Sequence, residues 1–461
     1  MQKQQGLKIA KFVIRWGIAV LGIYYVISRM SWHDRVLAIL PGQTVPRSLA
    51  LAEKGAGENQ LQYNVIDRSG AFVTVPHDQV VNEPDRAKLT VNFEGRQQYV
   101  VGVDLQPDME HANRILLADA PTGPTAHWEP AEHVPDYHIA VPHPRVQIGV
   151  IRMLHEADPR FLLAALLVFP ITILITSYRW HELLKALDIH LSLARIFVLN
   201  MVGLFYNTFM PGSTGGDLLK AYYVAKQTHH RTRAVMSVLV DRVIGLIALI
   251  ILGGTMAAFQ WQIQKCRQVA VGAGALMVCV IGGLALFYQP TLRRISGLDF
   301  FMSKLPMQKQ LQKAIEAMEI YGRRPLLALG ALLISFPVHM VVILSAMLCG
   351  FAFGLRINPF YYWMAVPVIV LAGSIPISPQ GAGVMEYFAI NLLEPQGVTV
   401  GQAFALTMSI RLTQIFWNLS GGYFVLRGGY HAPTQTEQNE VESEDEDRPK
   451  GKAAGQPTSV S

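Results

Sequence analysis

The chain has 461 residues, of which 51% are hydrophobic and only 16% are charged. Because a soluble domain carries about 25% charged residues, this composition favours a membrane protein. Three cysteines are too few for a disulfide scaffold, and the net charge of +6 comes from basic residues beside apolar runs. That distribution is typical of membrane topology and argues against a nucleic-acid-binding surface.

The first predicted element is an uncleaved signal-anchor helix within residues 1–29. Its apolar stretch, residues 16–27, follows the basic residues Lys3, Lys8, Lys11 and Arg15. A secretory signal peptide is the alternative, but residues 28–32 contain no small-x-small cleavage site. With its flanks the segment reaches about 20 residues, which is enough for a tilted span. The positive-inside rule predicts a cytoplasmic N-terminus.

Residues 30–157 are predicted to form a small β-rich domain outside the cytoplasm. Polar and apolar residues alternate in the segments 61–66, 71–75, 89–93 and 99–104, with turn-forming residues between them. A period of two is the pattern of short, half-buried strands. The region contains no cysteine, so an ordinary hydrophobic core must stabilise it.

Histidines and carboxylates gather near the end of this domain and suggest a metal site. They are His127, His133, His138 and His143, with Glu129, Glu132 and Asp136 among them. Such side chains bind transition metals, but their spacing matches no closed zinc pattern. Prolines 130, 135, 142 and 144 indicate an extended loop instead. We therefore predict neither a metal nor a cofactor.

Residues 158–428 are predicted to form an all-α polytopic membrane bundle. The candidate spans are residues 161–178, 196–210, 236–259, 269–288, 325–355, 359–375 and 403–426. The loops 181–191, 218–233 and 289–324 are rich in lysine and arginine, which places them in the cytoplasm. Residues 303–319 are amphipathic and are predicted to lie on the bilayer surface. Residues 429–461, with an acidic run at 437–447, are predicted to be a disordered cytoplasmic tail.

One apolar segment, residues 196–217, is broken by proline and glycine although both of its flanks carry basic residues. Its second half contains Pro211, Gly212, Gly215 and Gly216 before Asp217. These residues do not continue a stable helix. A re-entrant hairpin that enters and leaves from the same side explains both features. Because irregular backbone at membrane depth is tolerated only beside protein or water, the break predicts a cavity.

A second break of the same kind lies in the other half of the bundle. Pro376 and Pro379 precede Gly381 and Gly383, and Glu386 follows. If the C-terminus is cytoplasmic, this hairpin opens to the outside of the cell and the first hairpin opens to the cytoplasm. An inverted repeat would produce this arrangement. Paired interruptions of this kind are the best sequence indication of a transport site. The alternative is that both breaks are tight turns between ordinary spans.

Five ionisable residues lie within or next to these apolar segments: Asp217, Asp241, Arg242, Glu386 and Arg411. A charge near the bilayer centre costs roughly 2.5–3.5 kcal/mol, so these groups are expected to face one another or a wet cavity. Asp241 and Arg242 are neighbours that point about 100° apart on a helix, so each needs a partner on another element.

Several pairings of these charges are open. Glu386 and Asp217 are available to the arginines Arg242 and Arg411, and Arg411 is available to Asp241. The pairs either hold the bundle together or also bind a charged headgroup, since arginine grips phosphate as a planar fork. Arg179 and Trp180 lie at the end of a span, where we expect an interfacial anchor.

These motifs resemble the flippase-like transmembrane family, which includes the membrane half of lysylphosphatidylglycerol synthase/flippase. The resemblance rests on Asn207 and the first break through Asp217, on Asp241-Arg242 with Gly245, and on the second break from Pro379 to Glu386. Arg179-Trp180 also fits the family pattern. The resemblance covers roughly residues 160–428.

The resemblance implies a multi-pass plasma-membrane protein that handles a lipid or lipid-linked substrate and moves it between leaflets. It places Asp217, Asp241, Arg242 and Glu386 at the polar membrane positions of the family. Two features depart from the pattern. Only an acidic tail follows the last span, so aminoacyl-lipid synthesis is not supported, and the domain after the first span is an addition.

We therefore expect a lipid-translocating protein of a bacterial-type inner membrane, with both termini in the cytoplasm and residues 30–157 outside. A membrane enzyme acting on a lipid-linked substrate is one alternative, although common nucleotide-binding and hydrolase motifs are missing. A scaffold or sensor that uses the outer domain is the other. The predicted substrate-binding residues are Asn207, Pro211, Gly215, Gly216, Asp217, Asp241, Arg242, Gly381, Gly383, Glu386 and Arg411.

Overall fold

The computed structural model describes residues 17, 20–52, 57, 60–67, 70–84, 89–106, 112–120, 125–135, 137, 145–209, 215–228, 231–288, 321–322, 324–375, 378–428 and 430–431. The chain forms two compact units. The first comprises residues 1–171, 249–277 and 339–414, and the second comprises residues 172–248, 278–338 and 415–461. The second broken segment belongs to the first unit, whereas the first broken segment belongs to the second unit.

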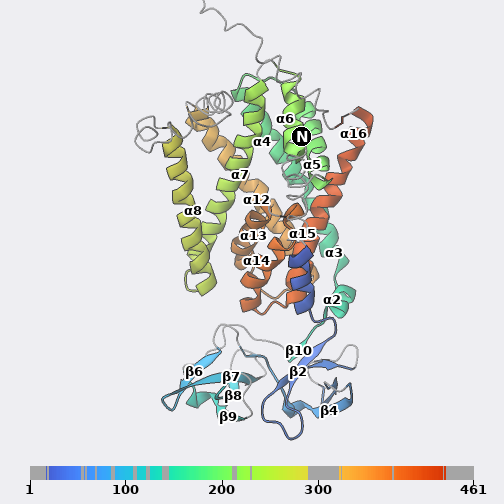
Figure 1. Cartoon of the computed structure of the whole chain (residues 1–461), viewed down its shortest axis with the longest axis vertical. Coiled ribbons are helices and arrows are strands. Elements are labelled where there is room, and N and C mark those ends of the chain that lie inside the picture. Colours follow the sequence, from blue (N-terminus) through green and yellow to red (C-terminus); the bar gives the residue numbers. More distant parts are fainter. Residues whose placement is uncertain are drawn as a thin grey trace, which may run out of the picture. The chain divides into compact units, whose positions relative to one another are not determined.

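The region before the helical bundle contains an antiparallel sheet with the strand order β10-β1-β2-β3-β4, in which β5 also pairs with β1 (Figure 1). Its strands are β1 (Arg35–Ala38), β2 (Arg47–Leu51), β3 (Gln62–Ile66), β4 (Phe72–Pro76), β5 (Val80–Val81) and β10 (Val146–Gln147). Tyr63 and Val65 of β3 alternate with partly exposed residues and are fully buried. Tyr63 lies opposite Val75 in the ladder, so this alternating face is the core of the sheet.

A second antiparallel sheet has the order β6-β7-β8-β9. Its strands are β6 (Thr90–Phe93), β7 (Arg96–Leu105), β8 (Ala112–Ala118) and β9 (Ala126–Pro130). The buried residues Ile115 and Leu117 of β8 belong to its core. A bridge between Asn82 and Val103 joins the two sheets. All four strands that the alternation predicts are therefore confirmed, as β3, β4, β6 and β7.

The proline-rich segment with the candidate metal ligands differs in part from its predicted extended loop. Residues 126–130 are strand β9, which pairs with β8, and a 3₁₀ turn, η2 (Ala131–His133), follows. His133 and His127 both lie within 4.0 Å of Glu129 at the protein surface. The correction has a simple reason: proline is tolerated at the end of an edge strand, where its missing donor is not needed. His138 and His143 lie outside the described residues.

The β region continues into a short helix, α2 (Val150–Glu156). Asp34, which is almost fully buried, accepts a hydrogen bond from the backbone of Gly149 at 2.8 Å and pairs with Arg152 at 3.0 Å. Hydrogen bonds to Glu156 and to Asp34 raise the pKa of Arg152. The residue that precedes β1 is thereby joined to the first helix after the sheets.

The remaining helices follow in chain order. They are α3 (Pro159–Val168), α4 (Pro170–Ala186), α5 (Leu193–Phe209), α6 (Gly215–Ala225), α7 (Arg231–Phe259), α8 (Gln264–Tyr288), α12 (Pro325–Ala352), α13 (Pro359–Ser374), α14 (Val384–Leu393), α15 (Val400–Ser420) and α16 (Gly422–Gly428). Short 3₁₀ turns lie at η1 (His77–Gln79), η3 (Pro379–Gly381) and η4 (Glu394–Gln396).

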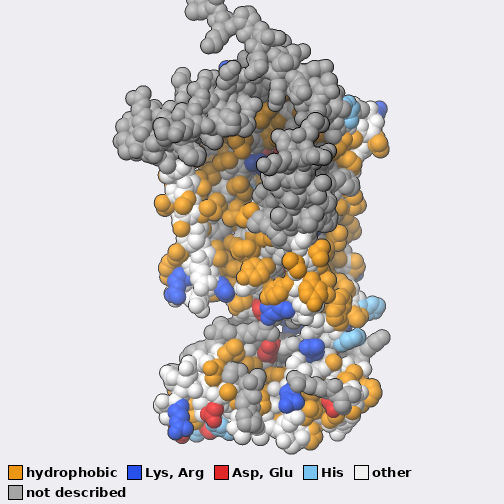
Figure 2. Space-filling model, in the orientation of Figure 1, with side chains coloured by type: hydrophobic (Ala, Val, Ile, Leu, Met, Phe, Trp, Pro, Cys, Tyr) orange, Lys and Arg blue, Asp and Glu red, His pale blue; other side chains and the backbone are white. Residues whose placement is uncertain are grey.

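Four helical stretches of the described residues are long and apolar enough to cross a bilayer: Pro159–Ala186, Arg233–Phe259, Gln264–Ala285 and Pro325–Ala352. Shorter apolar helices are Val20–Arg29, Leu193–Thr208 and Pro359–Ser374. Figure 2 shows that hydrophobic side chains cover much of the visible surface of the helical region. A multi-pass membrane protein explains this surface, because exposed apolar faces of this extent are rare in soluble monomers.

The predicted span 403–426 is divided, because α15 ends at Ser420 and α16 begins at Gly422. A side chain at Gly421 would overlap the backbone carbonyl of Met201 in α5, so only glycine allows this close approach. The signal-anchor prediction falls partly within the described helix Val20–Arg29. The predicted surface helix 303–319 and the acidic run 437–447 lie outside the described residues.

Candidate functional site

The first broken segment forms a helical hairpin of α5 and α6, hereafter the first hairpin (residues 193–225). The two helices meet at Gly203 and Gly216, where a side chain on Gly216 would overlap the carbonyl oxygen of Gly203. Asn207 is buried, and its Oδ1 accepts a hydrogen bond of 2.8 Å from the backbone N–H of Gly216. Asn207 thus satisfies one of the free amides at the start of α6. Pro211 lies outside the described residues.

Asp217, the third residue of α6, lies between two cations. Its Oδ2 accepts a hydrogen bond of 2.6 Å from Nε of Arg242 in α7, and Nζ of Lys220 lies 3.3 Å from Oδ1. Asp217 and Lys220 are buried, whereas 45% of the Arg242 side chain is exposed. Lys220 also lies over the ring of Trp180 at 4.8 Å. The first hairpin therefore holds a buried carboxylate against an accessible guanidinium.

Asp241 is held by a different arginine. Its Oδ1 accepts a hydrogen bond of 2.8 Å from Nε of Arg179 in α4, and Arg179 also donates from Nη1 to Ser335 at 2.7 Å. Both partners of this ion pair are only 5% exposed. Gly245 lies one turn after Asp241, and a Cβ there would be 3.5 Å from Arg179, so glycine leaves room for the guanidinium.

The expectation that Asp241 and Arg242 find partners on separate elements is confirmed, with α4 and α6 as those elements. The partner of Asp241, which the sequence left open, is Arg179 and not Arg411. The expectation that Arg179 and Trp180 are interfacial anchors is wrong. The indole of Trp180 is 1% exposed and donates to Ser237 at 3.0 Å. Both side chains point into the second unit because a buried carboxylate and a buried hydroxyl need donors there.

The second broken segment forms a hairpin of α13 and α14, hereafter the second hairpin (residues 359–393). Its glycines lie where a side chain would collide: a Cβ on Gly381 would meet the backbone of Gly373 in α13. Gly381 and Gly383 have φ angles of 69° and 83°, a conformation that glycine adopts without strain. Gly22 of the N-terminal helix packs against the backbone of Gly383.

Glu386, the third residue of α14, is fully buried and ion-paired. Its Oε1 accepts a hydrogen bond of 2.7 Å from Nη2 of Arg411 in α15, and its Oε2 accepts one of 2.7 Å from the backbone of Gly383. Arg411 is 7% exposed, yet among the described residues its Nε has no hydrogen-bond partner. The buried hydroxyl of Ser378 likewise lacks a partner there. Orphaned donors of this kind are rare unless water or a ligand satisfies them.

The two hairpins share one local design. In each, a glycine near the start of the second helix meets a glycine of the first helix, and the third residue of the second helix is an acid. In each, that acid pairs with an arginine 25 residues further along the chain. They differ in exposure, because Arg242 is accessible and Arg411 is enclosed.

The structure therefore brings Asn207, Gly216, Asp217 and Arg242 together in the second unit, and Gly383, Glu386 and Arg411 together in the first. Two residues of these clusters, Lys220 and Ser335, were not predicted as site residues, and Arg179 has a role other than the predicted one. A lysine one turn after Asp217 is a visible helical spacing. The Arg179–Asp241 contact spans 62 positions and has no local signal.

Several apolar helices long enough to cross a bilayer define the class of protein: a polytopic helical membrane protein. The family model described as lysylphosphatidylglycerol synthase TM region matches residues 149–421. The chain belongs to this family. The match starts after the β region, so residues 1–148 lie outside it.

Two UPF0104 membrane proteins are similar in sequence to this chain. A UPF0104 membrane protein of Pyrococcus horikoshii is 26% identical over 303 residues, which cover 60% of this chain and 90% of that protein. A UPF0104 membrane protein of Methanothermobacter thermautotrophicus is 24% identical over 289 residues, covering 58% of this chain and 84% of that protein. No solved structure matches the chain significantly.

Proposed function

We propose that this protein binds a lipid or lipid-linked substrate in the membrane and translocates its headgroup between leaflets. The observation that carries the proposal is the repeated acid–arginine pair, Asp217 with Arg242 and Glu386 with Arg411, each at the start of a broken helix. Membership of the lysylphosphatidylglycerol synthase TM region family supports a lipid-related role.

The helix order supports an internal repeat that underlies the two hairpins. The 28-residue stretches Pro159–Ala186 and Pro325–Ala352 each precede a hairpin and are separated from it by linkers of equal length, residues 187–192 and 353–358. A long helix follows each hairpin, α7 in one case and α15 in the other. Basic residues near the first hairpin favour opposite orientations of the two repeats and re-entrant geometry for both hairpins.

In the proposed mechanism the acid–arginine pairs bind the headgroup of the lipid while its acyl chains stay in the bilayer. Arginine binds phosphate or carboxylate through its planar fork of donors. Arg242 is accessible enough to make that contact. The orphaned Nε of Arg411 gives the second pair a donor for the same ligand. In an alternating-access cycle, the accessible Arg242 and the enclosed Arg411 would represent one state, and the opposite exposures would represent the other.

The glycines and Asn207 have a supporting role in this proposal. Gly215 and Gly216 begin α6, while Gly381 and Gly383 shape the turn before α14. The glycines let the helices of each hairpin pack closely, and Asn207 and Glu386 accept hydrogen bonds from the amides of Gly216 and Gly383. These residues therefore hold the acid of each pair in position for the headgroup.

The membrane topology is also part of the proposal. We infer that the N-terminus and the C-terminal tail face the cytoplasm of a bacterial-type cell membrane and that residues 30–157 lie outside. The distribution of lysine and arginine in the loops supports this orientation.

The test is transport by the purified full chain in reconstituted vesicles made from the lipids of its host. Arg242→Ala and Glu386→Ala are expected to abolish leaflet transfer while the proteins still insert into the membrane. Gly274→Ala is a matched control, since a Cβ there meets nothing within 4 Å. Unchanged transfer by both charge variants would reject the proposal.

A further inference from the structure

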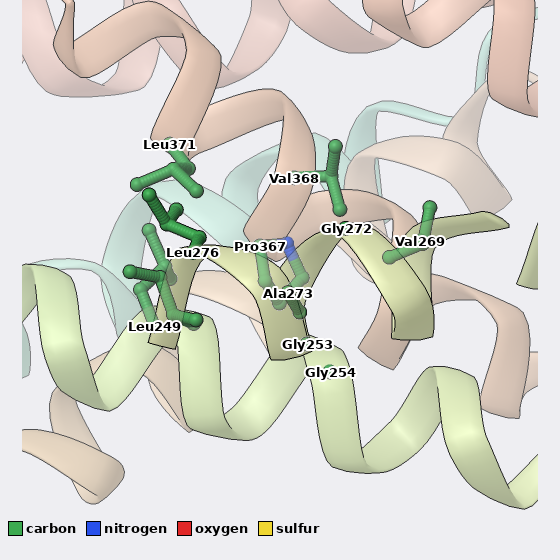
Figure 3. Close-up of a pocket in the computed structure, with 11 residues that line it drawn as sticks. Leu249, Gly253, Gly254, Val269, Gly272, Ala273, Leu276, Pro367, Val368 and Leu371 are labelled. Carbon is green, nitrogen blue, oxygen red and sulfur yellow. The ribbon is translucent and has the colours of Figure 1, made fainter. Parts of the chain in front are cut away.

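An apolar groove runs between α7, α8 and α13 in the first unit (Figure 3). Its volume is about 190 Å³, and every residue that lines it is apolar. An engineered apolar cavity of about 150 Å³ is already large enough to stay dry and bind benzene. The groove is therefore large enough for part of a hydrocarbon chain.

Small residues allow the three helices to pack closely, and the groove lies where the helices diverge. Gly253 of α7 lies against the ring of Pro367 in α13, and Gly254 lies against Ala273 of α8. Gly272 also lines the groove, but a Cβ at this position would meet no atom within 4 Å. Its missing side chain is part of the open space.

One end of the groove is polar and cationic. A second hollow shares Gly272 with the groove and is lined by Trp261, Arg267, Gln268 and Val271. Arg267 is exposed in the first turn of α8, and no described carboxylate lies within ion-pair distance of it. Trp261 lies in the turn between α7 and α8 and is 47% exposed. Tryptophan and arginine at the end of a span are typical of the headgroup level of a bilayer.

The α8 helix exposes most of its apolar surface, so in a membrane this surface faces lipid. It is one of the four potential spans, and none of its apolar window is buried in the structure. The groove therefore opens toward acyl chains. Because lipid tails are as apolar as leucine, the groove can pack against any acyl chain and does not distinguish one lipid from another. The headgroup that binds is therefore selected at the cationic end.

We propose that this groove is a binding site for one membrane lipid with an anionic phosphate headgroup. One acyl chain fills the groove along Gly272 and Leu276, and Arg267 holds the phosphate through its guanidinium fork. Trp261 lies beside the glycerol and headgroup region. None of the groove residues belongs to the acid–arginine pairs, so this site goes beyond the proposed transport and does not depend on it.

The test uses the full chain in phosphatidylcholine vesicles with a minor fraction of phosphatidylglycerol that carries a photoreactive acyl chain. Cross-links are expected on peptides of α7, α8 and α13. Gly272→Leu fills the groove and is expected to lower labelling about tenfold, which corresponds to about 1.4 kcal/mol. Gly274→Leu is the matched control on the same helix, because its side chain also meets open space but does not line the groove.

A second arm tests the headgroup contact. With Arg267→Gln, photoreactive phosphatidylglycerol and phosphatidylcholine are expected to label the groove equally, whereas the unaltered chain prefers phosphatidylglycerol. The same melting temperature for all variants excludes misfolding. Equal labelling of Gly272→Leu and the unaltered chain would overturn the proposal. An unlabelled groove in a chain that is dimeric by light scattering would also overturn it and would identify the groove as an interface between copies.

Discussion

Asp217, Asp241 and Glu386 each accept a hydrogen bond from an arginine on another helix. Two of these pairs, Arg179–Asp241 and Arg411–Glu386, are almost fully enclosed. Removing one partner of a buried pair is costly, because the remaining charge keeps its desolvation penalty without compensation. Arg242 differs, since nearly half of its side chain is exposed.

The enclosed Arg179–Asp241 pair is predicted to be structural. Arg179→Ala and Asp241→Ala are each expected to lower the free energy of unfolding by about 3–5 kcal/mol. The double variant Arg179→Met, Asp241→Leu replaces both charges with apolar side chains. Its loss of unfolding free energy is expected to be far smaller than the sum of the losses in the two alanine variants. Thermal unfolding of the purified variants in detergent measures this difference. Additive losses would mean that the two residues do not interact.

Arg242 is predicted to behave in the opposite way. Because it is accessible, Arg242→Ala is expected to cost less stability than Arg179→Ala, by at least about 1 kcal/mol, yet to stop leaflet transfer. The same unfolding series, with a transport assay on each variant, separates the two roles. A loss of stability in Arg242→Ala as large as in Arg179→Ala would assign Arg242 to the framework.

At the scale of the elements, the two breaks are tightly packed helical hairpins whose glycines meet a neighbouring backbone. The position of each break could be predicted because proline and glycine interrupt an apolar run, and the four strands could be predicted because side chains alternate along a sheet. The partner of Asp241 could not be predicted. Its choice of Arg179 depends on how α4 and α7 pack, which is a tertiary property.

Gly216 provides the test of this packing. Glycine to alanine in an open helix stabilises by about 0.5–1 kcal/mol, and Gly274→Ala is expected to do so. Gly216→Ala is expected to destabilise by about 1–3 kcal/mol, because the methyl group overlaps the carbonyl oxygen of Gly203. Comparing the melting temperatures of the two variants checks the prediction. Equal shifts in the same direction would refute the close approach.

The whole molecule combines a β region with a helical bundle that matches a membrane family. The loop charges predict that the β region and the C-terminal tail lie on opposite sides of the membrane. The apolar helices alone do not determine this orientation, because a bundle buries the same apolar faces whichever way round it is inserted in the membrane. The asymmetry of lysine and arginine is the physical feature that distinguishes them.

Cysteine labelling of intact cells tests the orientation. In a background without Cys266, Cys279 and Cys349, the variant Leu61→Cys is expected to react with a membrane-impermeant maleimide, because Leu61 is 88% exposed in the β region. A cysteine at Ser443 is expected to react only after permeabilisation. The reverse pattern would invert the topology.

The alternative that the protein is a scaffold or a sensor acting through its β region has its own test. Deleting residues 35–150 is expected to leave leaflet transfer by the helical bundle intact, since both acid–arginine pairs lie in the family region. Transfer by the shortened chain in vesicles, compared with the full chain, measures this. A complete loss by a stably inserted protein would make the β region part of the transport function.

The most direct test is leaflet-resolved lipid analysis of a deletion strain complemented with the unaltered chain, with Arg242→Ala or with Glu386→Ala. One lipid class is predicted to change its distribution between inner and outer leaflets in the deletion strain. The unaltered chain is predicted to restore this distribution. Neither variant is predicted to restore it when strains with equal levels of the three proteins in the membrane are compared. Full restoration by both variants, or leaflets unaffected by the deletion, would contradict lipid translocation through the paired charges.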